Sequence, residues 1–227
     1  MWDNYARCVS LPTIPPLGAT TMTPLRWFSC LTLIAVSSIS ASAKDGFVPL
    51  FDGKSLAGWS GDPELWTVED GMIVGSTESK TLKHNSFLAT SKTYKNFVLR
   101  LKFKLRNGNS GVQIRSKQHP DYVVRGYQAD IAESRFTGIL YEEGGRGILA
   151  DVDKDKIAKA FKRDDWNEYV ITCNGPRITQ VLNGVTTVDY TEKDPDRGAK
   201  EGIIALQLHV GPKMKIWFKD IEIQELP

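Results

Sequence analysis

Strict alternation of apolar and polar residues, with no long helical period, marks the chain after residue 43. In residues 97–106 (FVLRLKFKLR) all five odd positions are apolar and four of the five even positions are charged. Successive side chains of a strand point to opposite faces, so this pattern predicts a half-buried antiparallel strand. Comparable runs predict further strands at residues 66–74, 86–90, 111–115, 126–131, 168–173, 178–182, 202–209 and 215–223.

Tight turns separate these runs. Asn-Gly pairs at 174–175 and 183–184 and an Asp-Gly pair at 70–71 suit the positive φ angles of type I′ hairpin turns. The alternation slips by one residue near Asp220, which predicts a β-bulge. Residues 153–161 alone have the pattern of a short helix. Many short strands with regular turns predict an all-β fold, a sandwich of two antiparallel sheets.

The first 43 residues are not expected to belong to the fold, and residues 22–43 have the pattern of a targeting sequence. Residues 22–43 carry Arg26, then an apolar run at 27–36, then Ser-rich sequence that ends in Ala-Ser-Ala. This order is typical of a secretory signal peptide, and the apolar run is shorter than the ~20 residues that cross a bilayer. We interpret residues 1–21 as a mis-assigned upstream extension, with a genuine extension as the alternative. The prediction is one exported domain at residues 44–227, periplasmic or extracellular.

Signal-peptide cleavage between Ala43 and Lys44 is therefore an expected outcome. The small side chains at 41 and 43 fit the cleavage site that follows an apolar segment. N-terminal sequencing of the exported protein should begin at Lys44. A start well upstream, or retention of the full-length precursor, would contradict the assignment.

The amino-acid composition limits the kinds of binding partner that we expect for this chain. The chain has 29 basic and 27 acidic residues, a formal net charge of +2. This balance gives no long-range attraction to nucleic acid or to anionic membranes, so we expect neither as a partner and no membrane span. Cys173 is the one cysteine beyond the signal peptide, and its place in a predicted strand favours a structural thiol. The sequence has no specific metal or nucleotide motif, so any cofactor is unknown.

The segment 107–150 carries the candidate chemistry. Gln128 and Asp130 share one face of the predicted strand 126–131. Aspartate is disfavoured in strands, so we expect Asp130 to have a stabilising partner. Arg115 on the neighbouring predicted strand could supply a charge-assisted hydrogen bond. The alternative is an ordinary solvated face. Amides and charges interleaved with aromatics and glycines suit a surface that binds a polar, ring-shaped ligand such as a sugar.

Two further segments contribute candidates. His209 ends a predicted strand and shares a face with Gln207; a hydrogen-bonded structural histidine and a functional one are both open. Glu142 follows Tyr141 in a polar loop. If Asp130 and Glu142 meet across the sheet, they form a carboxylate pair able to transfer protons or to bind a divalent cation. The remaining substrate-binding candidates are the aromatic residues Tyr127 and Tyr141, and Arg146 in the glycine-rich turn 144–147.

Short motifs occur in a fixed order along the chain: LFDGKSLAGW (50–59), WTVEDG (66–71), NSGV (109–112), GYQADI (126–131), WNEY (166–169), LNG (182–184) and LQLH (206–209). By these motifs the chain resembles the 3-keto-disaccharide hydrolase domain family from residue 46 to residue 226. The segment 151–165 is longer and more charged than in many relatives, which bears on substrate fit.

The resemblance implies a concanavalin-like jelly roll of two curved antiparallel sheets. It also implies cleavage of glycosides that carry a ketone at C3, by removal of the C2 proton, elimination and hydration. We assign His209 as the base, Arg115 or a cation on Asp130 to the enolate, and Glu142 or Tyr141 to the leaving group. A non-catalytic, lectin-like carbohydrate-binding module is the alternative, and a two-carboxylate glycosidase a third.

These assignments imply a single site. Polar residues at alternate positions of a strand share a face, and the residues between them are apolar and face the other way. We therefore expect the polar residues to line one pocket on the concave face of one sheet. The residues expected to share it are Arg115, Gln128, Asp130, Gln207 and His209.

Overall fold

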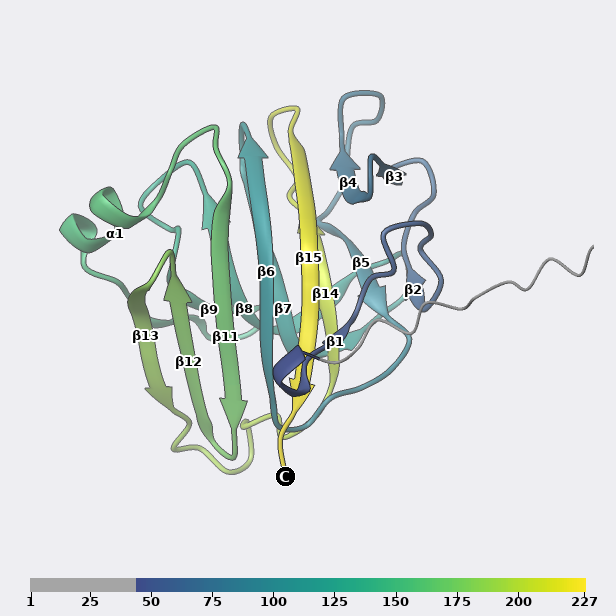
Figure 1. Ribbon diagram of the computed structural model, residues 1–227. Helices are drawn as coiled ribbons and strands as arrows, with labels where there is room; N and C mark the ends of the chain where they lie inside the picture. Colours follow the sequence, from purple (N-terminus) through teal and green to yellow (C-terminus); the bar gives the residue numbers. More distant parts are fainter. Residues whose placement is uncertain (1–43) are drawn as a thin grey trace, which may run out of the picture. The chain divides into compact units, whose positions relative to one another are not determined.

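The computed structural model describes residues 44–227. Two antiparallel sheets pack face to face as a β-sandwich, which confirms the all-β prediction (Figure 1). The proposed signal peptide at 22–43 and the extension at 1–21 lie outside the described residues. Within the described part, no helix is long and apolar enough to cross a membrane.

The first sheet lies in front in Figure 1 and has the order β13-β12-β11-β6-β15-β4-β3, with β1 paired to β15. Its central strand β6 (Phe97–Arg106) is the run whose alternation is clearest in the sequence, and its odd positions are buried against the second sheet. The other strands are β1 (Val48–Pro49), β3 (Trp66–Glu69), β4 (Met72–Ser76), β11 (Asn167–Asn174), β12 (Arg177–Leu182), β13 (Val185–Thr191) and β15 (Lys215–Glu225).

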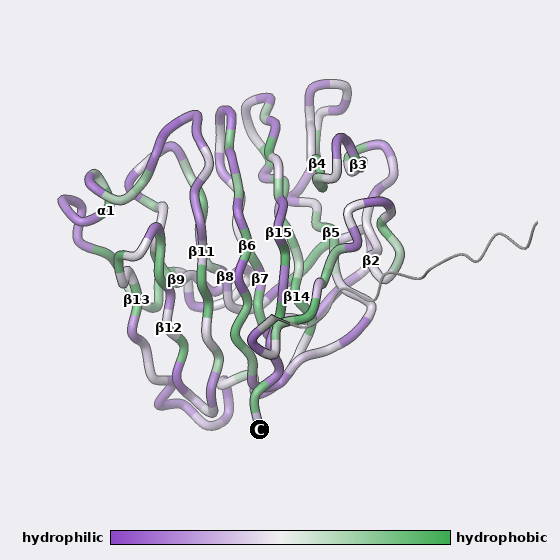
Figure 2. The backbone as a smooth tube through the Cα atoms, viewed as in Figure 1, coloured by the Kyte–Doolittle hydropathy of each residue, from purple (hydrophilic) through white to green (hydrophobic). Residues whose placement is uncertain are grey.

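The second sheet lies behind the first and has the order β10-β9-β8-β7-β14-β5-β2. Neighbouring strands pair antiparallel throughout both sheets, and Figure 2 shows apolar residues concentrated along the strands and polar residues in many of the connections. The strands of this sheet are β2 (Trp59–Ser60), β5 (Ser86–Thr90), β7 (Asn109–Gln118), β8 (Val124–Ala132), β9 (Leu140–Glu143), β10 (Gly147–Ala150) and β14 (Ile203–Leu208).

The predicted helix and two of the three predicted turns are confirmed. Asn183-Gly184 joins β12 to β13 and Asp70-Gly71 joins β3 to β4, each with positive φ at both residues. Asn174 instead ends β11 and pairs with Arg177, so Gly175 and Pro176 form the turn between β11 and β12. The helix α1 spans Lys154–Ala160, and the Asp153 side chain caps it by accepting hydrogen bonds from the amides of residues 155 and 156. A short 3₁₀ turn, η1 (Lys44–Gly46), precedes the sandwich.

The β-bulge predicted near Asp220 is present. The register of β15 against β6 shifts between Lys219 and Glu222, and Asp220 has a φ of 51°. The bulge shifts by one position the set of residues that face inward. The buried residues are Ile216 and Phe218 before the bulge, and Ile221 and Ile223 after it. The phase slip in the sequence is thus the signature of a real irregularity.

Strand β6 offers a test of the core. Leu101 is buried between the sheets, whereas Lys102 points outward and pairs with the exposed carboxylate of Asp220 at 2.9 Å. Leu101→Ala should lower the free energy of unfolding by about 2–5 kcal/mol through lost burial and a cavity. Lys102→Ala should change it by less than about 0.5 kcal/mol, because exposed ion pairs contribute little. Equal losses in urea melts of the two variants would contradict this orientation of β6.

Candidate functional site

A polar patch covers the face of the second sheet that is turned away from the first. Gln113 of β7 lies directly opposite Gln128 of β8, and Ala205 of β14 lies opposite Gln113. Side chains at directly paired positions share a face, so Gln128, Asp130 and Gln207 all belong to this outer face. Their apolar neighbours in sequence pack into the core. The prediction that the polar residues of β8 and β14 share a face is therefore confirmed.

A directed chain of hydrogen bonds links these side chains. The Ser116 hydroxyl donates to the side-chain oxygen of Gln113 at 2.6 Å, and the Gln113 amide donates to Gln128 at 2.8 Å. The Gln128 amide then donates to the Asp130 carboxylate at 3.1 Å and to the Gln207 oxygen at 3.4 Å. All these residues are buried, so each amide orientation is fixed by its neighbours.

The chain of amides continues to a second carboxylate. The Gln207 amide donates to Glu143 at 3.3 Å, and the Asn85 amide donates to the other oxygen of Glu143 at 3.0 Å. Asn85 is itself held by the backbone N–H of Val210 at 2.9 Å. The donors therefore run toward two acceptors, Asp130 and Glu143. This arrangement holds two carboxylates in place on one face of the sheet.

Gly111 makes room for this network. It lies opposite Asp130 in the pairing of β7 and β8. A Cβ atom at this position would come within 2.5 Å of the side-chain carbons of Gln128. Glycine is required because the Gln128 side chain occupies that space, and this explains one residue of the NSGV motif.

The two carboxylates border a cavity of about 260 Å³. The cavity is small beside typical ligand pockets, which span roughly 300–1,000 Å³, and it combines apolar walls with a few converging polar groups, as such pockets do. Its walls come from β7, β8, β9, β10, the loop before β9, and the residues that directly precede β5 and follow β14. The lining residues are Asn85, Asn109, Gln128, Asp130, Phe136, Ile139, Tyr141, Glu143, Ile148 and His209.

Asp130 is poised to exchange a proton near neutral pH. Its side chain is almost fully buried, and burial raises the pKa of Asp130 to about 7. Hydrogen bonds from Gln128 and Asn109 favour the charged form and partly offset burial, while the negative charge of Glu143 adds to the increase. A carboxyl group with this pKa in a cavity is suited to general acid or base catalysis.

His209 reaches the same cavity from the end of β14. Its Nδ1 lies within hydrogen-bonding distance of the Val210 carbonyl oxygen. A carbonyl oxygen only accepts, so the neutral ring must carry its hydrogen on Nδ1. The lone pair is then on Nε2, which can accept a proton.

Two more groups complete the polar lining. The side-chain oxygen of Asn109 is buried and has no hydrogen-bond partner within residues 44–227. Such an oxygen is costly unless a donor reaches it, and a ligand hydroxyl is a suitable donor. Burial raises the pKa of the Tyr141 phenol, so this hydroxyl stays protonated and can donate. Within the described residues, no three His, Cys, Asp or Glu side chains converge as a metal site.

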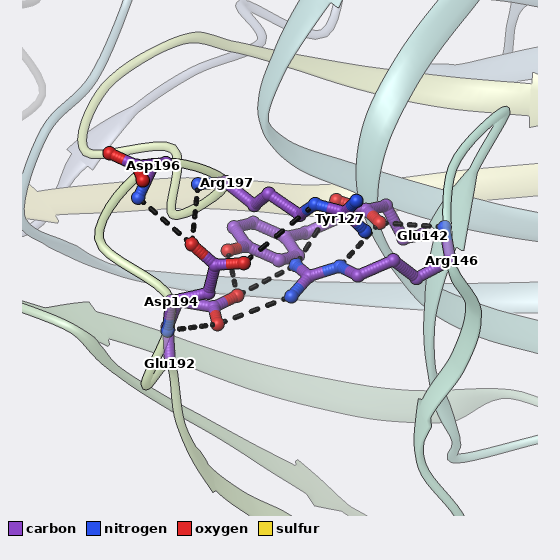
Figure 3. Close-up of polar contacts among 7 residues, drawn as sticks. All are labelled: Tyr127, Glu142, Arg146, Glu192, Asp194, Asp196 and Arg197. Carbon is purple, nitrogen blue, oxygen red and sulfur yellow. Dashed lines mark hydrogen bonds and ion pairs between the residues drawn. The ribbon is translucent and has the colours of Figure 1, made fainter.

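Three candidates lie on the opposite face. Tyr127 and Glu142 are paired across β8 and β9, and Tyr127 is buried in the core. Figure 3 shows the Tyr127 hydroxyl and Arg146 meeting Glu192, with hydrogen bonds of 2.6 Å and 2.7 Å. Arg146 also pairs with Glu142 at 2.7 Å. The predicted pairing of Asp130 with Glu142 is therefore wrong: Glu143, one residue later, faces the cavity.

Arg115 is also misplaced by the sequence argument. A bulge interrupts the pairing of β7 and β8 between Ile114 and Lys117, and Arg115 has a φ of 46°. Its guanidinium donates to the carbonyl of Lys95 at 2.6 Å and to that of Gly175 at 2.7 Å. It does not line the cavity of Asp130, because the bulge reverses the parity on which the prediction rested.

Of the nine candidate residues, the structure brings five to one site. Gln128, Asp130, Tyr141 and His209 line the cavity and Gln207 supports it; Arg115, Tyr127, Glu142 and Arg146 lie elsewhere. Sequence reasoning missed Asn85, Asn109 and Glu143. Asn109 lies in the NSGV motif, which could have drawn attention to it, whereas the register of β8 and β9 that selects Glu143 leaves no local signal.

Comparisons with known proteins agree with this architecture. The sequence model of the family described as 3-keto-alpha-glucoside-1,2-lyase-like domain matches residues 46–224. The curated 3-keto-disaccharide hydrolase of Bacteroides thetaiotaomicron is 36% identical over 78 residues, a stretch that covers 30% of this chain and 27% of that protein. The match thus spans about a quarter of the relative's length.

Solved structures extend the similarity to the whole sandwich. A candidate glycosyl hydrolase from Parabacteroides distasonis superposes with a TM-score of 0.59 at 23% identity, over 80% of this chain and 95% of that one. A galectin-like protein of unknown function from Bacillus subtilis gives 0.58 at 11% identity, over 79% and 94%. At these identities the likeness concerns the fold, and it confirms the prediction of a jelly-roll-like sandwich.

Proposed function

The chain belongs to the 3-keto-alpha-glucoside-1,2-lyase-like domain family, and from this membership we propose that it cleaves the glycosidic bond of glycosides carrying a ketone at C3. The family match and the glycosyl hydrolase-like relatives make it a carbohydrate-active domain. The observation that carries the finer proposal is the buried Asp130, whose pKa of about 7 places an exchangeable proton beside His209 in one cavity.

The ketone determines the chemistry. A carbonyl at C3 acidifies the C2–H bond, because the carbanion formed at C2 is delocalised onto the carbonyl oxygen. A base can then remove the C2 proton, and the substituent at C1 leaves with the electron pair of the C1–O bond. The reaction needs a base, a donor to the enolate oxygen and an acid for the leaving oxygen.

The cavity offers one residue for each role. Nε2 of His209 accepts the C2 proton, since Nδ1 is engaged with the Val210 carbonyl. The Tyr141 hydroxyl, kept protonated by its raised pKa, donates a hydrogen bond to the enolate oxygen. Asp130 in its acid form protonates the leaving oxygen. Glu143 and Gln128 orient and tune Asp130 rather than react.

Hydration then completes a net hydrolysis. The elimination leaves a C1–C2 double bond conjugated with the ketone, a protonated His209 and an ionised Asp130. Water adds at C1 as Asp130 takes one of its protons, and His209 returns a proton to C2. Both side chains regain their starting states, and the product is the free 3-keto sugar. A small carbohydrate substrate, met after export, remains our prediction.

Proton exchange at C2 provides the test. The protein is incubated in D₂O with a disaccharide and, separately, with its 3-keto form, and products are followed by NMR. We expect cleavage of the 3-keto form alone, with deuterium at C2 of the released sugar above the level in enzyme-free controls. Cleavage of both sugars without C2 deuterium would indicate a two-carboxylate glycosidase. Binding without cleavage would indicate a carbohydrate-binding module.

A further inference from the structure

A second cavity of about 350 Å³ lies apart from the first. It opens beside the β11–β12 turn and the segment that follows β13, and it shares no lining residue with the cavity of Asp130. Tyr127 and Ile178 from the core, with Pro176 and Ala199, give it largely apolar walls. Arg115 is a buried charged residue of its lining.

Arg115 is a buried cation without a carboxylate partner. It is 3% exposed, and within residues 44–227 no carboxylate oxygen lies within ion-pair distance of it. Nε and one hydrogen of each terminal nitrogen are used by the carbonyls of Lys95 and Gly175 and by the Asn96 side chain. A guanidinium has five N–H donors, so two remain, one on each terminal nitrogen. Two such donors match the two oxygens of a carboxylate.

The acidic residues at the cavity are already engaged. Glu192 is held by Arg146 and Tyr127, and these contacts lower the pKa of Glu192 to about 2. Asp194 accepts hydrogen bonds from the backbone N–H groups of Asp196 and Arg197, as Figure 3 shows. Asp194 also pairs with Arg197 at 3.7 Å, whereas Arg146 is shared between Glu192 and Glu142, so that group of three keeps one negative charge. Neither Glu192 nor Asp194 lies within ion-pair distance of Arg115.

Other positive charges border the same cavity. Lys95, Lys193 and Lys200 are exposed residues of its lining. With Arg115 they make the uncompensated charge of the cavity positive. Lysines near the entrance attract anions over the range of the Debye length, and the buried guanidinium can then fix the orientation of the bound anion.

The backbone around Arg115 is built to hold it there. Its positive φ of 46° is unusual for a residue with a long side chain, and the bulge of β7 re-aims it from the outer face to this cavity. A Cβ atom at Gly202, directly before β14, would come within 2.4 Å of the Arg115 backbone, so this position must be glycine. Strained, closely packed backbone of this kind is common at binding sites.

We propose that this second cavity binds a small organic acid, whose carboxylate contacts the two free N–H groups of Arg115 and whose apolar body contacts Ile178, Pro176 and Ala199. The site is independent of the reaction proposed above, because it lies on the other side of the second sheet. The failure of either proposal therefore leaves the other intact.

Matched acids and amides test the charge requirement. Benzoate and hexanoate are titrated into the ¹⁵N-labelled protein, each beside its uncharged amide, benzamide or hexanamide. We expect saturable shifts of the amide signals of Arg115, Ile178 and Ala199 with at least one acid, and binding of its amide weaker by about tenfold or more. Equal binding of acid and amide, or no saturation by either acid below about 20 mM, would overturn the proposal.

Two variants locate the binding. Ala199→Trp fills the cavity while leaving the three hydrogen bonds of Arg115 in place, so it should abolish saturable binding without loss of the folded spectrum. Arg115→Gln should also abolish it, but that change can disturb the fold through the lost contacts to residues 95, 96 and 175. Lys154→Gln, on helix α1, removes a distant positive charge and should bind as the parent does. If Ala199→Trp binds the acid with unaltered affinity, the acid does not bind in this cavity.

Discussion

Replacing Asp130 by asparagine is expected to abolish cleavage of a 3-keto glycoside while making the folded protein more stable at pH 8. The side chain loses its exchangeable proton, so the leaving oxygen has no acid. The network can adapt, because the Asn109 amide can turn over and present its oxygen, which has no partner in the described residues, to the new amide. Gln128 can still donate to the remaining side-chain oxygen. Loss of activity should therefore not be caused by loss of structure.

The gain in stability follows from the raised pKa. Asp130 has a pKa of about 7 in the fold and an ordinary pKa of about 3.9 when unfolded. The fold therefore holds the proton more tightly, and the stability that this gives is complete below about pH 4 and lost as pH rises through about 7. Asparagine cannot ionise, so the variant keeps at every pH the stability that the parent has when Asp130 is protonated. At pH 8 we expect Asp130→Asn to raise the free energy of unfolding by about 2–4 kcal/mol.

Urea melts at pH 8 and pH 4 check this prediction. The stabilisation should be present at pH 8 and nearly vanish at pH 4, where the native carboxyl is protonated too. Asp155→Asn, an exposed change on helix α1, is the control and should shift neither melt. An Asp130→Asn protein that is less stable than the parent at pH 8 would show that the ionised carboxylate is not the costly form.

The pH profile of the enzyme should report the same group. If Asp130 is the acid, kcat/KM falls as pH rises through about 7, because the protonated form disappears. Glu143→Gln removes a neighbouring negative charge that raises this pKa, so the decline should move to lower pH. A kcat/KM that does not fall above about pH 7 would remove Asp130 from the role of acid.

The sandwich was predictable because its signals are local. The alternation in 97–106, the Asn183-Gly184 turn and the phase slip at Asp220 each depend on a few adjacent residues, and each is confirmed. The shared face of Gln128 and Asp130 was accessible for the same reason, since both lie in one uninterrupted strand. Parity within a single strand is a reliable guide to orientation.

The failures arise where parity must be carried between strands. Arg115 lies in a bulge that its own sequence does not signal, and a shift of one residue sends a side chain to the other face. Glu142 and Glu143 are adjacent and chemically alike, so only the register of β8 against β9 decides which one faces the cavity. Long-range pairing therefore limits what the sequence reveals about the site.

His209→Ala is expected to remove turnover of a 3-keto glycoside and to leave the melting transition nearly unchanged. The side chain directly follows β14 and is half-buried, and within residues 44–227 its one hydrogen bond is to the adjacent Val210 carbonyl, so little packing is lost. Without a base the C2 proton stays in place, and deuterium at C2 should vanish together with cleavage.

His119→Ala is the matched control, because His119 follows β7 and does not line the cavity of Asp130. It should retain both activity and C2 exchange. Loss of cleavage in His209→Ala with C2 exchange intact would place His209 after proton removal, at the leaving group. Full activity in that variant would exclude His209 as the base. The role would then fall to Asp130, whose pKa of about 7 suits proton exchange.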